Sequence, residues 1–243
     1  MGFAGLFYPW GFLLQAVAIV HFVRRRPDTY WLWVIFLGGA IGALIYIAAE
    51  VIPDVSLLRR SLNRVSNRRK IRDLEALVVQ NPAVGNYEEL ADLCFDDGQF
   101  ARARELYDHV IAKRPDSIDA YYRRGMSELA TNDVAAALAD LERVVAQDPK
   151  YDFHRAIGLL AHANALAGNV DRADALFKAA TGVSTLSETS YNYAAFHASE
   201  KRTADARAWA ERILATKASM PRYLRRRERP WFQRAAALMK KLK

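Results

Sequence analysis

Residues 98–103 read GQFARA, residues 132–137 read NDVAAA and residues 168–173 read GNVDRA. Each stretch places a turn residue, glycine or asparagine, directly before a helix that opens with alanine. The stretches start 34 and 36 residues apart, and Pro115 and Pro149 repeat the spacing of 34 residues. A period of this length predicts a solenoid of stacked helix pairs, in which each pair needs its neighbours to bury its apolar face.

Two further sets of residues repeat with the same period. Small residues recur where the two helices of one repeat would meet, at Ala91, Gly125, Ala161 and Ala194. Bulky residues recur where neighbouring repeats would meet, at Tyr107, Leu141 and Phe177. A helical bundle without repeats is the alternative, and this regular spacing argues against it.

The first repeat carries a further pattern, with matching residues at Tyr87, Leu90, Ala91, Cys94, Ala103, Tyr107, Val110 and Pro115. This pattern resembles the tetratricopeptide repeat, which has an aromatic residue, Leu-Gly, tyrosine, alanine, an aromatic residue, alanine and proline. The resemblance implies a right-handed α-solenoid of about three to four repeats. The third repeat has a two-residue insertion near Tyr151, and the fourth is degraded.

We predict an all-α chain with four segments. They are a transmembrane helical hairpin at 1–52, a basic amphipathic linker with a half-repeat helix at 53–83, the solenoid at 84–219 and a basic capping helix at 220–243. The expected repeats lie at about 84–117, 118–151, 154–186 and 187–219.

The hairpin is predicted from two apolar stretches. Residues 2–23 and residues 30–49 contain no Asp, Glu, Lys or Arg, and each is long enough to cross a hydrocarbon core of about 30 Å as a helix. Only residues 24–29, RRRPDT, separate them, so the two helices would be antiparallel. Two buried helices of a soluble domain are the alternative.

Basic residues predict the orientation of this hairpin. Residues 53–73 contain seven Lys or Arg, more than the loop between the two stretches. The positive-inside rule places the larger cluster, and with it the repeats, on the cytoplasmic side. We therefore predict a protein of the bacterial inner membrane with two spans.

Within the hairpin, residues 24–26 read RRR, residues 30–35 read YWLWVI and residues 39–46 read GAIGALIY. These stretches resemble the N-terminal membrane hairpin of cardiolipin synthases and of phospholipase D/nuclease-associated proteins. Gly39 stands where that family usually has proline. The catalytic His-x-Lys-x-x-x-x-Asp signature of the enzyme class follows none of the five histidines, so the resemblance implies a shared anchor without shared chemistry.

The tetratricopeptide resemblance also implies a binding groove, because the first helices of successive repeats line a concave surface in that family. The corresponding positions in this sequence are Glu88, Asp92, Phe95, Tyr122, Met126, Arg155, His162, Tyr191 and Asn192. Such a surface would bind an extended peptide or a partner helix, and the acidic Glu88 and Asp92 would favour a basic or neutral ligand. Solvated positions without a ligand are the alternative for each residue.

A second expected surface follows the hairpin. Val55, Leu58, Leu62 and Val65 share one helix face among basic residues. The residues expected to contact anionic lipid headgroups are Arg59, Arg60, Arg64, Arg68, Arg69 and Lys70. A linker helix with solvated charges is the alternative. The formal net charge is +8, but the sequence shows no recognised nucleic-acid-binding module. We therefore expect no nucleic-acid partner.

No catalytic chemistry is visible in the sequence. Cys94 is the only cysteine, which excludes an intrachain disulfide and a cysteine metal cluster, and the histidines lack ligand spacing. We therefore predict no catalytic residue, no cofactor and no metal. The leading hypothesis is a membrane-anchored, non-catalytic adaptor that binds a protein partner. The alternative is an accessory factor, or a divergent enzyme, of anionic phospholipid and cardiolipin metabolism.

Overall fold

The computed structural model describes residues 8–25, 29–51 and 56–242, apart from the side chains of residues 8–10, 25, 51, 56–66 and 222. Within these ranges the regular secondary structure is entirely helical, which confirms the all-α prediction. The chain forms an N-terminal unit, residues 1–69, and a C-terminal unit, residues 70–243.

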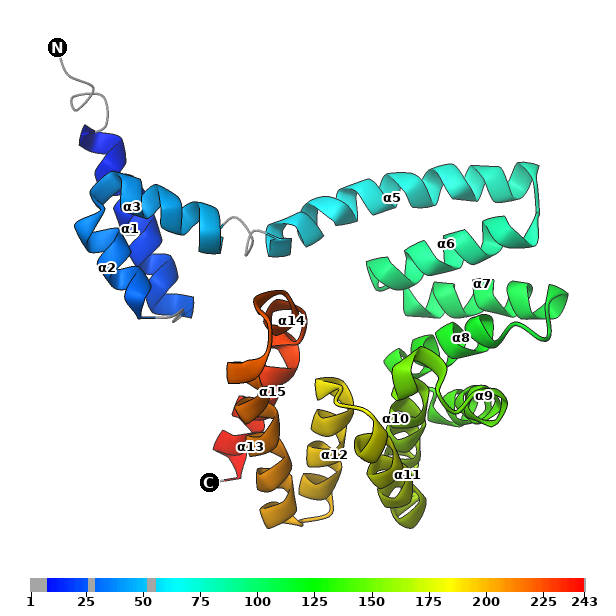
Figure 1. Ribbon diagram of the computed structural model, residues 1–243. Helices are drawn as coiled ribbons and strands as arrows, with labels where there is room; N and C mark the ends of the chain where they lie inside the picture. The colour runs from blue at the N-terminus through cyan, green and yellow to red at the C-terminus, as the bar shows by residue number, and fades with distance from the viewer. Residues whose placement is uncertain (1–7, 26–28, 52–55, 243) are drawn as a thin grey trace. The chain divides into compact units, whose positions relative to one another are not determined.

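A small apolar cluster organises the N-terminal unit. Its helices are α1 (Tyr8–Arg25), α2 (Tyr30–Leu37), α3 (Gly39–Tyr46) and the π-helical turn η2 (Ile47–Val51) (Figure 1). The buried side chains of the cluster are Ala18, Trp31, Ile35, Ala43 and Tyr46. The hydroxyl of Tyr46 also forms a hydrogen bond of 2.8 Å with Nδ1 of His21.

Glycines divide the second apolar stretch into two short helices. Gly39 adopts a positive φ of 53°, a backbone conformation that favours glycine. A Cβ on Gly38 would lie 2.6 Å from the carbonyl oxygen of Val34, and a Cβ on Gly42 would overlap the same oxygen. The absence of side chains at these positions therefore lets the chain bend sharply between α2 and α3.

No described helix is both long and apolar enough to cross a membrane. α1 has 18 residues, about 27 Å, but it includes Gln15, His21, Arg24 and Arg25. α2 and α3 have 8 residues each, about 12 Å, against a hydrocarbon core of about 30 Å. The prediction of a two-span transmembrane hairpin in the inner membrane is therefore wrong, and the cytoplasmic side expected for the repeats depended on those spans. Residues 2–7 of the first apolar stretch lie outside the described residues.

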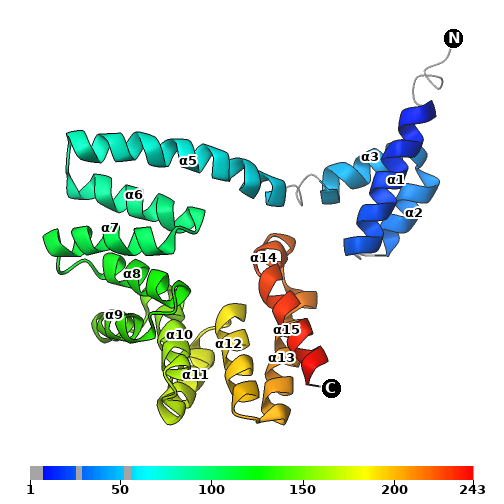
Figure 2. The same cartoon turned by 180° about the vertical axis from the view of Figure 1, so that it is seen from behind.

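The C-terminal unit is a solenoid of stacked helix pairs, as predicted. The boundary between the units falls within α5 (Ser56–Gln80). The four pairs are α6 (Val84–Asp97) with α7 (Phe100–Lys113), α8 (Ile118–Ala130) with α9 (Val134–Gln147), α10 (Tyr151–Leu166) with α11 (Val170–Val183), and α12 (Ser187–Ser199) with α13 (Thr203–Ser219). Two helices follow, α14 (Arg222–Arg227) and α15 (Arg229–Lys241). Figures 1 and 2 show the pairs following one another along an arc.

One turn geometry joins the two helices of every pair. The turn residue has a positive φ at Gly98, Asn132, Gly168 and Lys201. The residue after it donates its backbone N–H to the carbonyl five residues earlier, at 2.8–2.9 Å, which closes the first helix. Glycine and asparagine tolerate this conformation, so the sequence pattern reveals the first three turns. Lys201 is not a typical residue for this conformation, so the sequence does not reveal the fourth turn although its geometry is the same.

The small and bulky residues occupy the positions that their spacing predicts. Ala91, Ala161 and Ala194 are completely buried, and a Cβ on Gly125 would lie 3.2 Å from Cγ of Leu141 on the paired helix. The bulky side chains at the matching positions of the second helices are also completely buried, at Tyr107, Leu141 and Phe177. Along the solenoid, small residues therefore allow the two helices of a pair to approach closely, and bulky side chains fill the space between neighbouring pairs.

The insertion near Tyr151 produces a local distortion. Asp152, Phe153 and His154 have φ values of 48°, 54° and 66° in the first turn of α10. Two hydrogen bonds from the preceding repeat hold this turn. The hydroxyl of Tyr122 donates to Asp152 at 2.5 Å, and the hydroxyl of Tyr151 donates to Asp119 at 2.6 Å. The extra residues are thereby accommodated without separating the second and third repeats.

The end of the chain packs on the last helix pair. Phe232 and Ala235 of α15 are buried against Ala210 and Ile213 of α13. Pro230 stands in the first turn of α15, where the missing N–H costs no intrahelical hydrogen bond. α15 therefore covers an apolar face that a further repeat would otherwise bury.

The close approach of α10 and α12 leads to a stability prediction. A Cβ on Gly158 would lie 2.5 Å from Oγ1 and 2.9 Å from Cγ2 of Thr189, a β-branched residue that is 1% exposed. We expect Gly158→Ala to lower the free energy of unfolding by about 1–3 kcal/mol, because the added methyl group would overlap the buried Thr189 side chain and force a shift in the packing. Urea unfolding followed by circular dichroism measures this change.

Gly85→Ala is the matched control. No atom lies within 4 Å of the added methyl group at Gly85, in the first turn of α6. The free energy of unfolding of Gly85→Ala should stay the same or rise by up to about 1 kcal/mol, since alanine has a higher helix propensity than glycine. Equal stability of Gly158→Ala and the unmodified chain would contradict the packing described for α10 and α12.

Candidate functional site

A groove of about 520 Å³ lies in the C-terminal unit. α6, α8, α10 and α12, the first helices of the four pairs, supply most of its lining, and α7 and α15 add the rest. The lining residues are Phe95, Phe100, Met126, Leu129, Ala130, Arg155, Leu159, His162, Glu188, Asn192, Trp231 and Arg234. Seven of these twelve side chains are apolar, so the groove offers an apolar surface with a few polar groups.

Five of the nine positions expected from the sequence line this groove together. They are Phe95, Met126, Arg155, His162 and Asn192. They come from four successive first helices, so the helix stacking alone brings together side chains that are up to 97 residues apart in the sequence (192 − 95).

The other four expected residues have different surroundings. Glu88 accepts a hydrogen bond of 3.0 Å from Arg114, and Asp92 accepts one of 2.5 Å from the hydroxyl of Tyr107. Tyr122 is buried and donates to Asp152. Tyr191 packs against Trp231, with 5.7 Å between the ring centroids. Their assignment to a binding surface stays a prediction.

An ion pair lies within the groove. Nε of Arg155 donates to Glu188 at 2.6 Å, and the guanidinium is 3.5 Å from Asp152. Burial alone would lower the pKa of Arg155, but the hydrogen bond and charge of Glu188 raise it above its ordinary value. Burial also lowers the pKa of His162, against a smaller opposing effect of Glu188, which favours the neutral form of His162.

Trp231 and Arg234 are the groove residues that sequence reasoning missed most clearly. They belong to α15, which the sequence presents only as a cap for the last repeat. They are three residues apart and therefore share one helix face. That spacing was the available signal, but nothing in the sequence shows that this face turns toward the first helices.

The basic residues expected to contact lipid lie on α5. Arg68, Arg69 and Lys70 are exposed on α5. The side chains of Arg59, Arg60 and Arg64 lie outside the described residues. The contact of these six residues with lipid stays a prediction.

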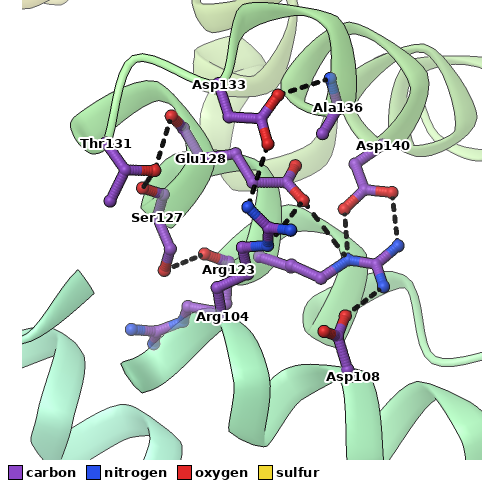
Figure 3. A network of polar contacts seen from close by, with 10 residues as sticks. Arg104, Asp108, Arg123, Ser127, Glu128, Thr131, Asp133, Ala136 and Asp140 are labelled. Atoms are coloured by element: carbon purple, nitrogen blue, oxygen red, sulfur yellow. Dashed lines mark hydrogen bonds and ion pairs between the residues drawn. The ribbon is translucent and has the colours of Figure 1, made fainter. Parts of the chain in front are cut away.

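A second cluster of charged residues joins the first and second repeats (Figure 3). Arg124 of α8 binds both carboxylate oxygens of Asp140 on α9, at 2.7 and 2.8 Å, and reaches Asp108 of α7 at 2.6 Å. Glu128 lies one turn further along α8, 3.8 Å from Arg124 and 4.0 Å from Arg104. Its Oε2 is buried without a hydrogen-bond partner.

The surroundings of Glu128 perturb its protonation. Burial raises its pKa to about 7, the charge of Asp140 adds to the shift, and Arg124 and Arg104 oppose it. Buried carboxyl groups with such a pKa occur as general acids in enzymes. Only 3% of Glu128 is exposed, however, so a substrate cannot reach its carboxyl group. We interpret the cluster as part of the packing between repeats.

Within the described ranges, no three His, Cys, Asp or Glu side chains converge to hold a metal ion. Cys94 is buried in the core of the first repeat, and this burial raises the pKa of its thiol. A buried, protonated thiol is a poor nucleophile and a poor metal ligand.

The family comparison agrees with the helix pairs. A model of the tetratricopeptide repeat matches residues 88–152 and 122–187. The two matches together cover residues 88–187 and support the predicted tetratricopeptide repeats. Proteins of this family are typically non-catalytic and mediate protein interactions. The match does not extend to residues 1–87, so it gives no support to the resemblance with the cardiolipin synthase hairpin. No curated protein matches the sequence.

Several solved structures have a similar fold. MamA from residue 41 to its end, from Desulfovibrio magneticus RS-1, is 20% identical with a TM-score of 0.58, over 68% of this chain and 93% of that chain. TTC0263, a thermophilic TPR protein of Thermus thermophilus, is 19% identical with a TM-score of 0.55, over 76% and 96%. YrrB, described as a TPR protein with an unusual peptide-binding site, is 16% identical with a TM-score of 0.52, over 67% and 82%. At these identities the likeness concerns the fold alone.

The raised pKa of Glu128 predicts a pH-dependent stability. Between pH 4.5 and about 7 the folded state holds a proton that the unfolded chain has released. The free energy of unfolding therefore falls as the pH rises through this window, and above it the full cost of the buried charge is present. We expect Glu128→Gln to stabilise the protein at pH 8 by on the order of 2 kcal/mol, and to change little at pH 4. Urea unfolding at both pH values measures the difference.

Asp140→Asn provides the contrast within the same cluster. It removes a carboxylate that holds Arg124 through two hydrogen bonds, and should destabilise the protein at pH 8 by about 3 kcal/mol. A loss of stability in Glu128→Gln at pH 8 would mean that attraction to Arg124 and Arg104 outweighs the cost of burial.

Proposed function

We propose that this protein is a non-catalytic scaffold that binds a segment of a partner protein in the groove along the first helices. The observation that carries the proposal is the groove itself. Its apolar residues come from successive repeats, and all of them except Leu159 are at least partly exposed, whereas Tyr107, Leu141 and Phe177 at the repeat interfaces are fully buried. An accessible apolar surface of this kind is typical of a protein-interaction site.

The size and chemistry of the groove suit a peptide segment. A volume of about 520 Å³ accommodates a few large side chains rather than a folded domain. The flexible side chain of Met126 can adapt to a ligand. Rigid aromatic contacts come from Phe95, Phe100 and Trp231. The peptide-binding site named for the structurally similar protein YrrB is consistent with this proposal.

The alternative role in anionic phospholipid metabolism depended on the hairpin resemblance. Neither the family match nor a contact among the described residues favours it, so we do not propose it as a second function. Lipid contact through the basic face of α5 likewise has no observation that favours it over solvated charges.

A peptide selection tests the proposal. Random 12-residue peptides displayed on phage are selected against the immobilised full-length chain, and the affinities of synthetic copies are measured by fluorescence anisotropy. We expect Met126→Lys to weaken these affinities about tenfold or more, because it places a charge in the apolar part of the groove.

Val183→Lys is the control, because Val183 is exposed at the end of α11 and does not line the groove. It should leave the affinities unchanged. Melting temperatures of both variants exclude unfolding as the cause. Peptides that bind Met126→Lys as tightly as the unmodified chain, or a selection without binders, would overturn the proposed site.

A further inference from the structure

The charges of the groove do not cancel. Among the described residues that line it, Glu188 is the single carboxylate, and Arg155 neutralises it at 2.6 Å. Burial lowers the pKa of His162, which favours its neutral form. The guanidinium of Arg234 is the remaining charge, so the groove carries one net positive charge.

Arg234 is held in place without being neutralised. Its guanidinium carbon lies 4.5 Å from the centroid of the Trp231 ring, and Trp231 in turn packs against Tyr191 of α12. No carboxylate lies within 4.0 Å of its guanidinium in the part of the chain that the structure describes. A cation–π contact orients the guanidinium and leaves its N–H donors unused.

A second polar group in the groove lacks a partner. Asn192 of α12 is 8% exposed, and its side-chain amide has no hydrogen bond to any described residue. Asn192 lines the groove, so its amide is free to form a hydrogen bond with a ligand there. α12 and α15 pack together, which places Asn192 and Arg234 on adjacent helices.

The acidic residues near the other end of the groove are already paired. Glu88 binds Arg114 at 3.0 Å, and Asp92 accepts from Tyr107 and lies 3.9 Å from Arg123. Neither lines the groove. The sequence suggested a preference for a basic ligand because Glu88 and Asp92 are acidic. Both carboxylates already have partners, so they would attract such a ligand only weakly.

We propose that the groove selects segments in which an acidic side chain stands beside large apolar side chains. The carboxylate binds Arg234 over the Trp231 ring, Asn192 hydrogen-bonds to the ligand, and the apolar side chains contact Met126 and Leu129. The inference rests on the proposed function and specifies its ligand. α15 thereby acts as a specificity element in addition to covering the last repeat.

The phage-selected peptides described above test this ligand class. We expect Asp or Glu to be enriched at one position next to large apolar residues. A synthetic peptide with an amidated C-terminus should bind about tenfold more weakly after Glu→Gln substitution, because a charge-assisted hydrogen bond is lost. The chain with Arg234→Gln should bind the Glu and Gln peptides equally.

Arg212→Gln is the matched control. Arg212 also stacks on a tryptophan, at 4.9 Å from the Trp209 ring centroid, but it lines a different, smaller cavity. This variant should keep the tenfold preference for Glu. Melting temperatures of all variants establish that they are folded, which is expected because Arg234 is exposed.

The possible outcomes separate the two proposals. A selection without binders overturns the proposed function and this inference with it. Binding that Met126→Lys abolishes, without acidic enrichment or with a preference that survives Arg234→Gln, overturns only the ligand class. Loss of binding on amidation would show that a terminal carboxylate is recognised, and would overturn the assignment to a side chain.

Discussion

The structure of the C-terminal unit depends on one constraint, which is that no helix pair can bury its apolar face alone. Completely buried residues such as Ala91 and Ala161 bring the two helices of a pair together, and Tyr107 and Phe177 fill the space between pairs. Each repeat is therefore stable only against its neighbours. The same stacking fixes the distances between first helices, and so creates the groove along them.

Polar contacts between repeats determine which charges remain available. Hydrogen bonds such as Tyr122 to Asp152 and ion pairs such as Arg155 with Glu188 connect successive first helices and use up their carboxylates. A carboxylate that is already paired attracts a ligand weakly, because its partner screens it. The electrostatic character of the groove is therefore set by Arg234, which stacks on an aromatic ring and has no acidic partner among the described residues.

The membrane prediction was wrong because it counted apolar residues without considering where a helix must end. Residues 30–49 have the composition of a membrane span, but Gly39 takes a positive φ and divides them between α2 and α3. Gly38 and Gly42 carry no side chains that would clash with Val34, so they permit a sharp bend within the stretch. A continuous membrane-spanning helix and two short helices can have the same composition, so only the backbone conformation distinguishes the two structures.

The sequence by itself determined the helix pairs and their period, and the tetratricopeptide resemblance implied five residues that line the groove, including Phe95 and His162. It could do so because turn residues and small residues recur at a fixed spacing, and spacing is a local property. Only the tertiary structure decided that α15 turns Trp231 and Arg234 into the groove, and that Glu88 and Asp92 are paired. Those outcomes depend on contacts between helices far apart in the chain, which no local pattern encodes.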